Sequence, residues 1–183
     1  MRLKMPIFFD NDCICSFSWV NRLDILITLF ENNIYIPANV IREIERLKFT
    51  KSKYVYENIK RQIESGSFKV AELTPSDEFF PEYIQLTDKD NINRIGEGEA
   101  EAIALAKQYN GTLASNNLKD VLPNIQPDHP PLITTETILY LAYQQKLISF
   151  QEGQQILDEM QLRKRKLSTY SFFELLDKYK ETI

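Results

Sequence analysis

Short apolar runs alternate with amphipathic stretches along the first 133 residues. Short apolar runs predict strands over residues 6–9, 34–36, 112–114 and 132–133, and residues 68–73, which also contain Lys69 and Glu72, are a candidate for a further strand. Between them, apolar residues recur at helical spacing and predict helices over residues 22–30, 38–47, 53–64 and 99–109. Strands that alternate with helices in this way indicate an α/β fold around a mainly parallel sheet.

The remaining segments predict one interrupted region and a helical end. Pro75 and Pro81 break residues 74–95, which we expect to hold a connecting helix and a loop, and residues 123–131 form a proline-marked loop. Two Ser-x-x-Glu capping boxes start predicted helices: Ser149 with Glu152, and Ser171 with Glu174. We therefore expect a domain over residues 1–135 and a helical C-terminal extension over residues 136–183 packed on it.

The composition is that of a globular chain. With 183 residues, of which 43% are hydrophobic and 26% charged, the chain can bury a core without disulfides. Its net charge of -4 argues mildly against a nucleic-acid partner. However, an acidic metal site would offset basic clusters elsewhere. Two such clusters exist, Lys48 with Lys51 and Lys53, and the run 163–166, and each is either a solvated helix face or a contact to nucleic acid.

The cysteines and the apolar runs bear on the compartment. Cys13 and Cys15 stand two residues apart, and there is no second pair that would complete a zinc site. A reduced pair of this kind fits the cytosol. Residues 7–9 are too short for the apolar part of a signal peptide, and no stretch approaches the length of a membrane span. We expect a cytoplasmic protein without a membrane partner.

Acidic residues follow or flank several predicted elements. Asp10 directly follows the first strand, and ligand sites of parallel sheets lie beyond the carboxyl ends of the strands. A helix N-cap or an Asx-turn explains the same residue equally well. Glu43 borders the apolar face of the helix 38–47, although a surface Glu paired with Arg42 or Arg46 is the simpler interpretation.

A third group of acids, Glu97, Glu99 and Glu101, opens the helix predicted over residues 99–109. The helix dipole alone favours acids there. Glu99 shares a helical stripe with Ile103, which we expect to face the sheet. Glu101 lies about 200° around the helix from Glu99 and is the poorer partner. Hard cations such as Mg²⁺ need only a few carboxylates, so Asp10, Glu43 and Glu99 would suffice together.

Four segments resemble the motifs of PIN-domain nucleases in order and spacing. They are Ile7–Asn11, Ile36–Ile44, Gly96–Ala106 and Leu113–Asn117. The resemblance covers roughly residues 5–135, and the helical end is similar to the C-terminal extension of bacterial toxin-type PIN proteins. It implies a three-layer α/β fold with a mostly parallel central sheet. It also implies hydrolysis of phosphodiester bonds, usually of RNA, that depends on Mg²⁺ or Mn²⁺ held by Asp10, Glu43 and Glu99.

The resemblance also implies partners and supporting residues. Many relatives are toxins that a small antitoxin protein holds, and relatives often form homodimers. Ser115 would orient an acid or a water, and Asn11 and Asn116 would contact the substrate or support the acids. The sequence departs from the family where it has Asn116 and Asn117 in place of an expected Asp. Asn117 can still coordinate a hard metal or bond its water, and Asp120 could restore the missing charge.

Two other functions stay open. A HAD-type phosphatase would use Asp10 as its nucleophile and Asp12 beside it, but residues 115–117 lack the acidic pair that this class needs. A non-catalytic PIN-like module that binds nucleic acid or protein is the other alternative, and the Asn116–Asn117 departure is its main support.

Overall fold

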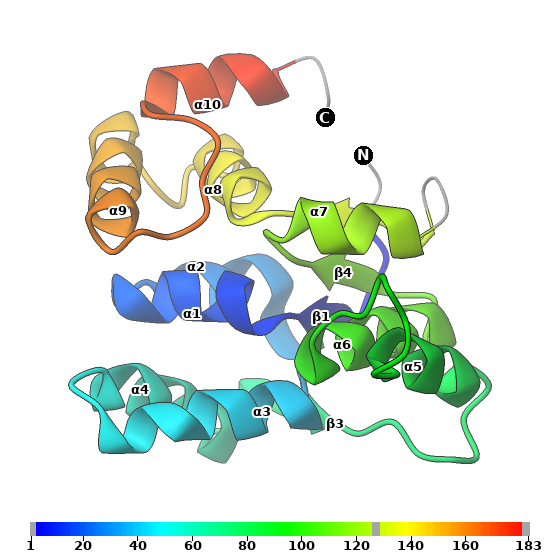
Figure 1. The fold of residues 1–183 in the computed structure, drawn as a ribbon. Coiled ribbons are helices and arrows are strands. Elements are labelled where there is room, and N and C mark those ends of the chain that lie inside the picture. The colour runs from blue at the N-terminus through cyan, green and yellow to red at the C-terminus, as the bar shows by residue number, and fades with distance from the viewer. Residues whose placement is uncertain (1–2, 126–128, 181–183) are drawn as a thin grey trace.

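The computed structural model describes residues 3–125 and 129–180. Its centre is a five-stranded sheet in the order β3-β2-β1-β4-β5, with every neighbouring pair parallel (Figure 1). The strands are β1 (Ile7–Phe9), β2 (Ile34–Pro37), β3 (Phe68–Ala71), β4 (Thr112–Ala114) and β5 (Leu132–Ile133). All five match predicted strands within two residues at each end, and the predicted α/β fold is confirmed.

Helices cover both faces of the sheet, which makes three layers. On β1, Ile7 and Phe9 pack into one core cluster and Phe8 into the other, because successive side chains of a strand point to opposite faces. The Ile7 face is covered by α1 (Asn11–Trp19), α2 (Leu23–Phe30), α3 (Ala38–Glu45) and α4 (Lys53–Glu64). The Phe8 face is covered by α5 (Phe80–Thr87) and α6 (Glu97–Gln108). The short α7 (Leu118–Val121) follows β4.

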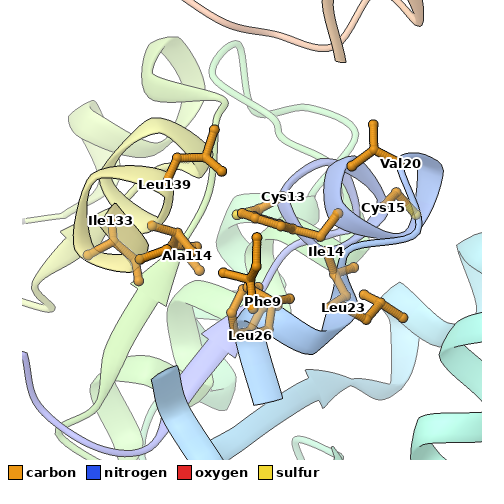
Figure 2. Packing of buried hydrophobic residues seen from close by; sticks show 14 of the residues in the cluster. Phe9, Cys13, Ile14, Cys15, Val20, Leu23, Leu26, Ala114, Ile133 and Leu139 are labelled. Atoms are coloured by element: carbon orange, nitrogen blue, oxygen red, sulfur yellow. The ribbon is translucent and has the colours of Figure 1, made fainter. Parts of the chain in front are cut away.

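Helix α1 was not predicted. All six residues from Cys13 to Ser18 are buried. The helix therefore has no solvent-exposed polar face there, and the sequence lacks the amphipathic pattern that predicts a helix. Its apolar side chains fill the space between β1, α2 and α8 (Figure 2). Asp10 is its N-cap, with Oδ1 accepting a hydrogen bond of 2.7 Å from Cys13 N. Cys13 and Cys15 are free thiols, and burial raises the pKa of the Cys15 thiol to about 12.

Several boundaries differ from the prediction by a turn or less. Helix α6 begins at Glu97 rather than at residue 99, because Gly96 supplies the extended N-cap. Helix α3 ends at Glu45 and continues as a 3-10 turn, η2 (Arg46–Phe49). Two further 3-10 turns are η1 (Glu31–Asn33) and η3 (Leu122–Asn124). The helix and loop predicted for residues 74–95 are confirmed by α5, whereas residues 126–128 of the predicted proline-marked loop lie outside the described residues.

The C-terminal third is helical, as predicted, and shares the main core. It contains α8 (Thr135–Gln144), α9 (Phe150–Leu162) and α10 (Phe172–Tyr179), and both predicted capping boxes are present. Phe172 packs edge-on against Tyr143, with 5.6 Å between ring centroids, and belongs to the same cluster as Ile7 and Phe9. The division into residues 1–135 and 136–183 stays a prediction.

In the described part of the chain, no single helix has the length and apolar character to cross a membrane. Among the described helices, α1 taken together with the α2–η1 segment is the one pair that passes such a test, and these two are bent by 120°.

Candidate active site

A pocket of about 440 Å³ opens at the carboxyl end of the central strands. It gathers side chains from the ends of β1 and β4, from α1, α3, α6 and α7, and from the segment between α9 and α10. Its polar lining consists of Asp10, Asn11, Asp12, Glu43, Glu99, Asn117, Asp120, Arg165 and Lys166. The three predicted metal acids, Asp10, Glu43 and Glu99, therefore face one pocket, as expected from acids placed at one sheet edge.

Asp10 is the most deeply placed of these acids, with only 4% of its surface exposed. The N-cap interpretation is confirmed, and the same side chain also lines the pocket, with its two carboxylate oxygens in different hydrogen bonds. Oδ1 caps α1, and Oδ2 accepts a short hydrogen bond from the hydroxyl of Ser115. Burial raises the pKa of Asp10 to about 7 in spite of these two bonds. The Ser115 hydroxyl thus fixes the orientation of the Asp10 carboxylate, and its role in a functional site stays a prediction.

Glu99 projects from the first turn of α6 and is half-buried. Its Oε1 is buried without a hydrogen-bond partner among the described residues. Burial, together with the nearby charges of Asp10 and Asp120, raises the pKa of Glu99 to about 7. Leaving a buried carboxylate oxygen without a partner is costly, and such groups usually have a functional reason.

Asn117 stands at the position where the PIN motif has an Asp. Its side-chain amide donates to Oε2 of Glu99 at 3.3 Å and to Oδ2 of Asp120 at 2.6 Å. The amide therefore lies between two carboxylates and satisfies one oxygen of each. Asp120 is carried by α7, so the short helix proposed for this charge exists.

Glu43 is held by the protein itself. Its Oε2 accepts a hydrogen bond of 3.0 Å from the side-chain amide of Asn11, and its Oε1 accepts one of 3.2 Å from the backbone of Gly98. A Cβ at position 98 would lie 2.7 Å from Oε1 of Glu43, so a side chain there would displace the Glu43 carboxylate from this position. Asn11 therefore supports an acid, which is one of its two predicted roles.

Two polar residues near the pocket have other roles. Both atoms of the Asn116 amide bond Thr135, its Oδ1 accepting from the backbone N at 2.8 Å, so Asn116 ties β4 to the start of α8. Glu101 is only 2% exposed and accepts hydrogen bonds from the backbone of Asn39 and Leu73 at 2.7 and 3.1 Å. It fastens α3 and the segment after β3 to α6 and does not line the pocket, in agreement with its expected poorer position.

The cations of the pocket were not singled out as site residues. Arg165 pairs with Asp12 at 3.3 Å and lies over the ring of Trp19, with its guanidinium carbon 5.6 Å from the ring centroid. Lys166 also lines the pocket. The only sequence signal was the basic run 163–166, which fitted a solvated helix face as well. In the other basic cluster, Lys48 and Lys53 make surface ion pairs.

The donor set suits a hard divalent cation, although the side chains do not yet converge on one point. Among the described residues, no three His, Cys, Asp or Glu side chains form a ready-made metal cluster. The physical reason is that protein donors hold Asp10, Glu43 and Asp120 individually. The buried, unpartnered Oε1 of Glu99 and the raised pKa values of Asp10 and Glu99 nevertheless fit a group that supplies positive charge.

A family model described as a PIN domain matches residues 6–181. No curated protein matches the chain. The match does not support the HAD-type alternative, and it extends through the C-terminal helices to include Arg165 and Lys166. PIN domains are generally nucleases, which indicates a nuclease-type function here. Because the match covers nearly the whole length, this chain belongs to the PIN-domain family.

Proposed function

We propose that this PIN domain is an endoribonuclease that depends on Mg²⁺ or Mn²⁺. The observation that carries the proposal is the set of carboxylates in one pocket: Asp10, Glu43, Glu99 and Asp120 come from four different elements. Two of them, Asp10 and Glu99, have pKa values raised to about 7, and one oxygen of Glu99 is buried without a partner. A protein tolerates such a cluster at a cost that a bound cation would remove.

Asp10, Glu43 and Glu99 would hold the ion, and Asp120 would add a fourth carboxylate to the pocket. When bound, the metal would make a water molecule more acidic and stabilise negative charge developing at the phosphate. Ser115 keeps the Asp10 carboxylate in one orientation, and Asn11 with the Gly98 backbone does the same for Glu43. Asn117 spaces Glu99 from Asp120 without adding a charge to the cluster.

RNA is the proposed substrate because the family resemblance favours it. A role as the toxin of a toxin–antitoxin pair, a small antitoxin partner and a homodimer stay predictions, as does cytoplasmic location.

Cleavage of a mixed panel of RNA and single-stranded DNA tests the proposal, with Mg²⁺, with Mn²⁺ and with EDTA. Asp10→Asn and Glu99→Gln are the test variants. The matched control is Glu97→Gln, since Glu97 lies in the same first helical turn as Glu99 but is exposed and outside the pocket. We expect metal-dependent cleavage of RNA by the wild type and the control, and a loss of at least about 100-fold in both test variants.

Two results would overturn the proposal. Cleavage that persists in Asp10→Asn and Glu99→Gln would show that the activity does not use this pocket. No cleavage by folded wild-type protein in either metal would favour the non-catalytic module, with Asn117 as the first suspect.

A further inference from the structure

The segment between α9 and α10 (orange in Figure 1) contributes Arg165 and Lys166 to the lining of the acidic pocket. We call residues 163–169 the basic strap. Its far end is anchored by Glu136 of α8, which accepts hydrogen bonds from the backbone of Ser168 at 2.7 Å and from the backbone of Thr169 at 2.8 Å. The hydroxyls of Ser168 and Thr169 also donate to Glu136, at 2.7 and 3.0 Å. The strap is therefore fixed in place by a buried carboxylate.

The two cations of the strap that reach the pocket differ in what they contact. Arg165 is occupied by the protein, because it pairs with Asp12 and lies over Trp19. Lys166 is exposed, and among residues 3–125 and 129–180 it makes no hydrogen bond or ion pair. It is close enough to the acids for its charge to lower the pKa values of Asp10 and Glu99 somewhat. A cation held at this place without a protein partner is available to a ligand.

Lys166 also lies at a junction. A second pocket, of about 420 Å³, adjoins the acidic pocket, and the two share Asn117 and Lys166 in their linings. The second pocket carries two further basic side chains, Lys119 and Lys178, of which Lys178 pairs with Glu136 in the same lining. A ligand that extends from the first pocket into the second would pass Lys166, because Lys166 lines both pockets.

We propose that Lys166 binds a backbone phosphate of the nucleic-acid substrate where it passes from the acidic pocket into the second pocket. This inference rests on the proposed nuclease function. The carboxylates of the pocket repel a polyanion, and a cation beside them offsets part of this repulsion with or without a bound metal. The lysine ammonium is a compact charge that contacts phosphate oxygens without a fixed angle. Lys166 is then a substrate-binding residue, and Glu136 is a positioning residue.

The test compares Lys166→Gln with the matched control Lys164→Gln and with the conservative Lys166→Arg. Lys164 lies on the same strap, is exposed and carries the same charge, but it does not line either pocket. Each variant is measured in two ways. One is cleavage of RNA with Mn²⁺, analysed as kcat and KM. The other is binding of a short fluorescein-labelled single-stranded RNA in EDTA, followed by anisotropy over a range of salt concentrations.

We expect Lys166→Gln to lower kcat/KM by about tenfold or more and to reduce the slope of log affinity against log salt by about 1. Lys164→Gln should change kcat/KM by less than about twofold, and Lys166→Arg should restore most of the binding. If the wild type cleaves RNA and the two Gln variants have the same kcat/KM and the same RNA affinity, the inference is wrong and the nuclease proposal stands. If the wild type does not cleave but Lys166→Gln alone loses RNA binding, the nuclease proposal fails and the phosphate contact stands. Equal RNA binding by all variants overturns the contact in either case.

Discussion

Glu136 offers the sharpest test of how the C-terminal helices are attached. It is 4% exposed, and its carboxylate accepts hydrogen bonds from Ser168 and Thr169. The carboxylate also forms an ion pair with Lys178, with 2.9 Å between Oε2 and Nζ. Burial alone would raise the pKa of Glu136. The bonds from Lys178, Ser168 and Thr169 outweigh burial and lower the pKa from 4.5 to about 2. Glu136→Gln keeps the shape of the side chain but removes the charge that these donors face.

The size of the effect follows from the pKa. Each unit of difference between the folded and unfolded pKa values is about 1.4 kcal/mol, so ionisation of Glu136 stabilises the folded chain by at most about 3.5 kcal/mol. Solvent screens part of this, because the Lys178 side chain is 44% exposed. We expect Glu136→Gln to lower the free energy of unfolding by about 2 kcal/mol near neutral pH.

Urea unfolding of the wild type, Glu136→Gln and the control Glu159→Gln measures this. Glu159 is exposed on α9, so its replacement should change the free energy of unfolding by less than about 0.5 kcal/mol. The pKa of Glu136 is lowered by folding. Its stabilisation is therefore complete above pH 4.5 and disappears as the pH falls through 4.5 towards 2. The gap between wild type and Glu136→Gln should narrow over that range. A gap that is equally wide near pH 7 and near pH 3 would refute the reasoning.

Three further substitutions separate structural acids from site acids. Asp10→Asn should raise the melting temperature in EDTA at about pH 8, because a neutral amide replaces a buried carboxylate. Added Mn²⁺ should raise the melting temperature of the wild type but not of this variant. A variant that melts below the wild type in EDTA would contradict this reasoning. Glu101→Gln should lower the free energy of unfolding by about 1–3 kcal/mol, since Glu101 accepts from two backbone N–H groups, while cleavage per folded molecule stays intact. Asn117→Asp should destabilise the metal-free chain by like-charge repulsion and strengthen Mn²⁺ binding measured by calorimetry; unchanged Mn²⁺ affinity would place Asn117 outside the metal site.

Most of the sheet could be predicted from the sequence because β1, β2, β4 and β5 are short, largely apolar runs with a clear stop, whereas β3 contains the exposed Lys69. Even β5, with two residues, is marked by the prolines before it and the threonines after it. Helix α1 could not be predicted in the same way. Helical periodicity is visible only when one face is polar, and the α1 residues from Cys13 to Ser18 are buried on all sides. The local signal that remained was Asp10 as an N-cap, which does not give the length of the helix that follows.

The positions of the site acids could be predicted only where they follow from the predicted strand order. Once β1 and β4 are parallel neighbours, Asp10 and residues 115–117 must meet at one edge. The hydrogen bonds that hold the acids were not predictable, since they join residues far apart in sequence. Asn11 reaches Glu43 across 32 positions, and Arg165 reaches Asp12 across 153. Neither hydrophobic periodicity nor motif spacing in the sequence predicts hydrogen bonds between residues so far apart.

The net charge of -4 now has a structural explanation. Five of the acids, Asp10, Asp12, Glu43, Glu99 and Asp120, line a single pocket. A pocket built only from them would repel the phosphates it is proposed to cleave. The sequence meets this in two ways: it places a neutral Asn117 between two of the acids, and it brings Arg165 and Lys166 to the rim from the C-terminal helices. The C-terminal segment therefore belongs to the electrostatics of the pocket as well as to the core. The basic run 163–166 could be a solvated helix face when only the sequence is considered. In the folded chain, two of its residues line the acidic pocket.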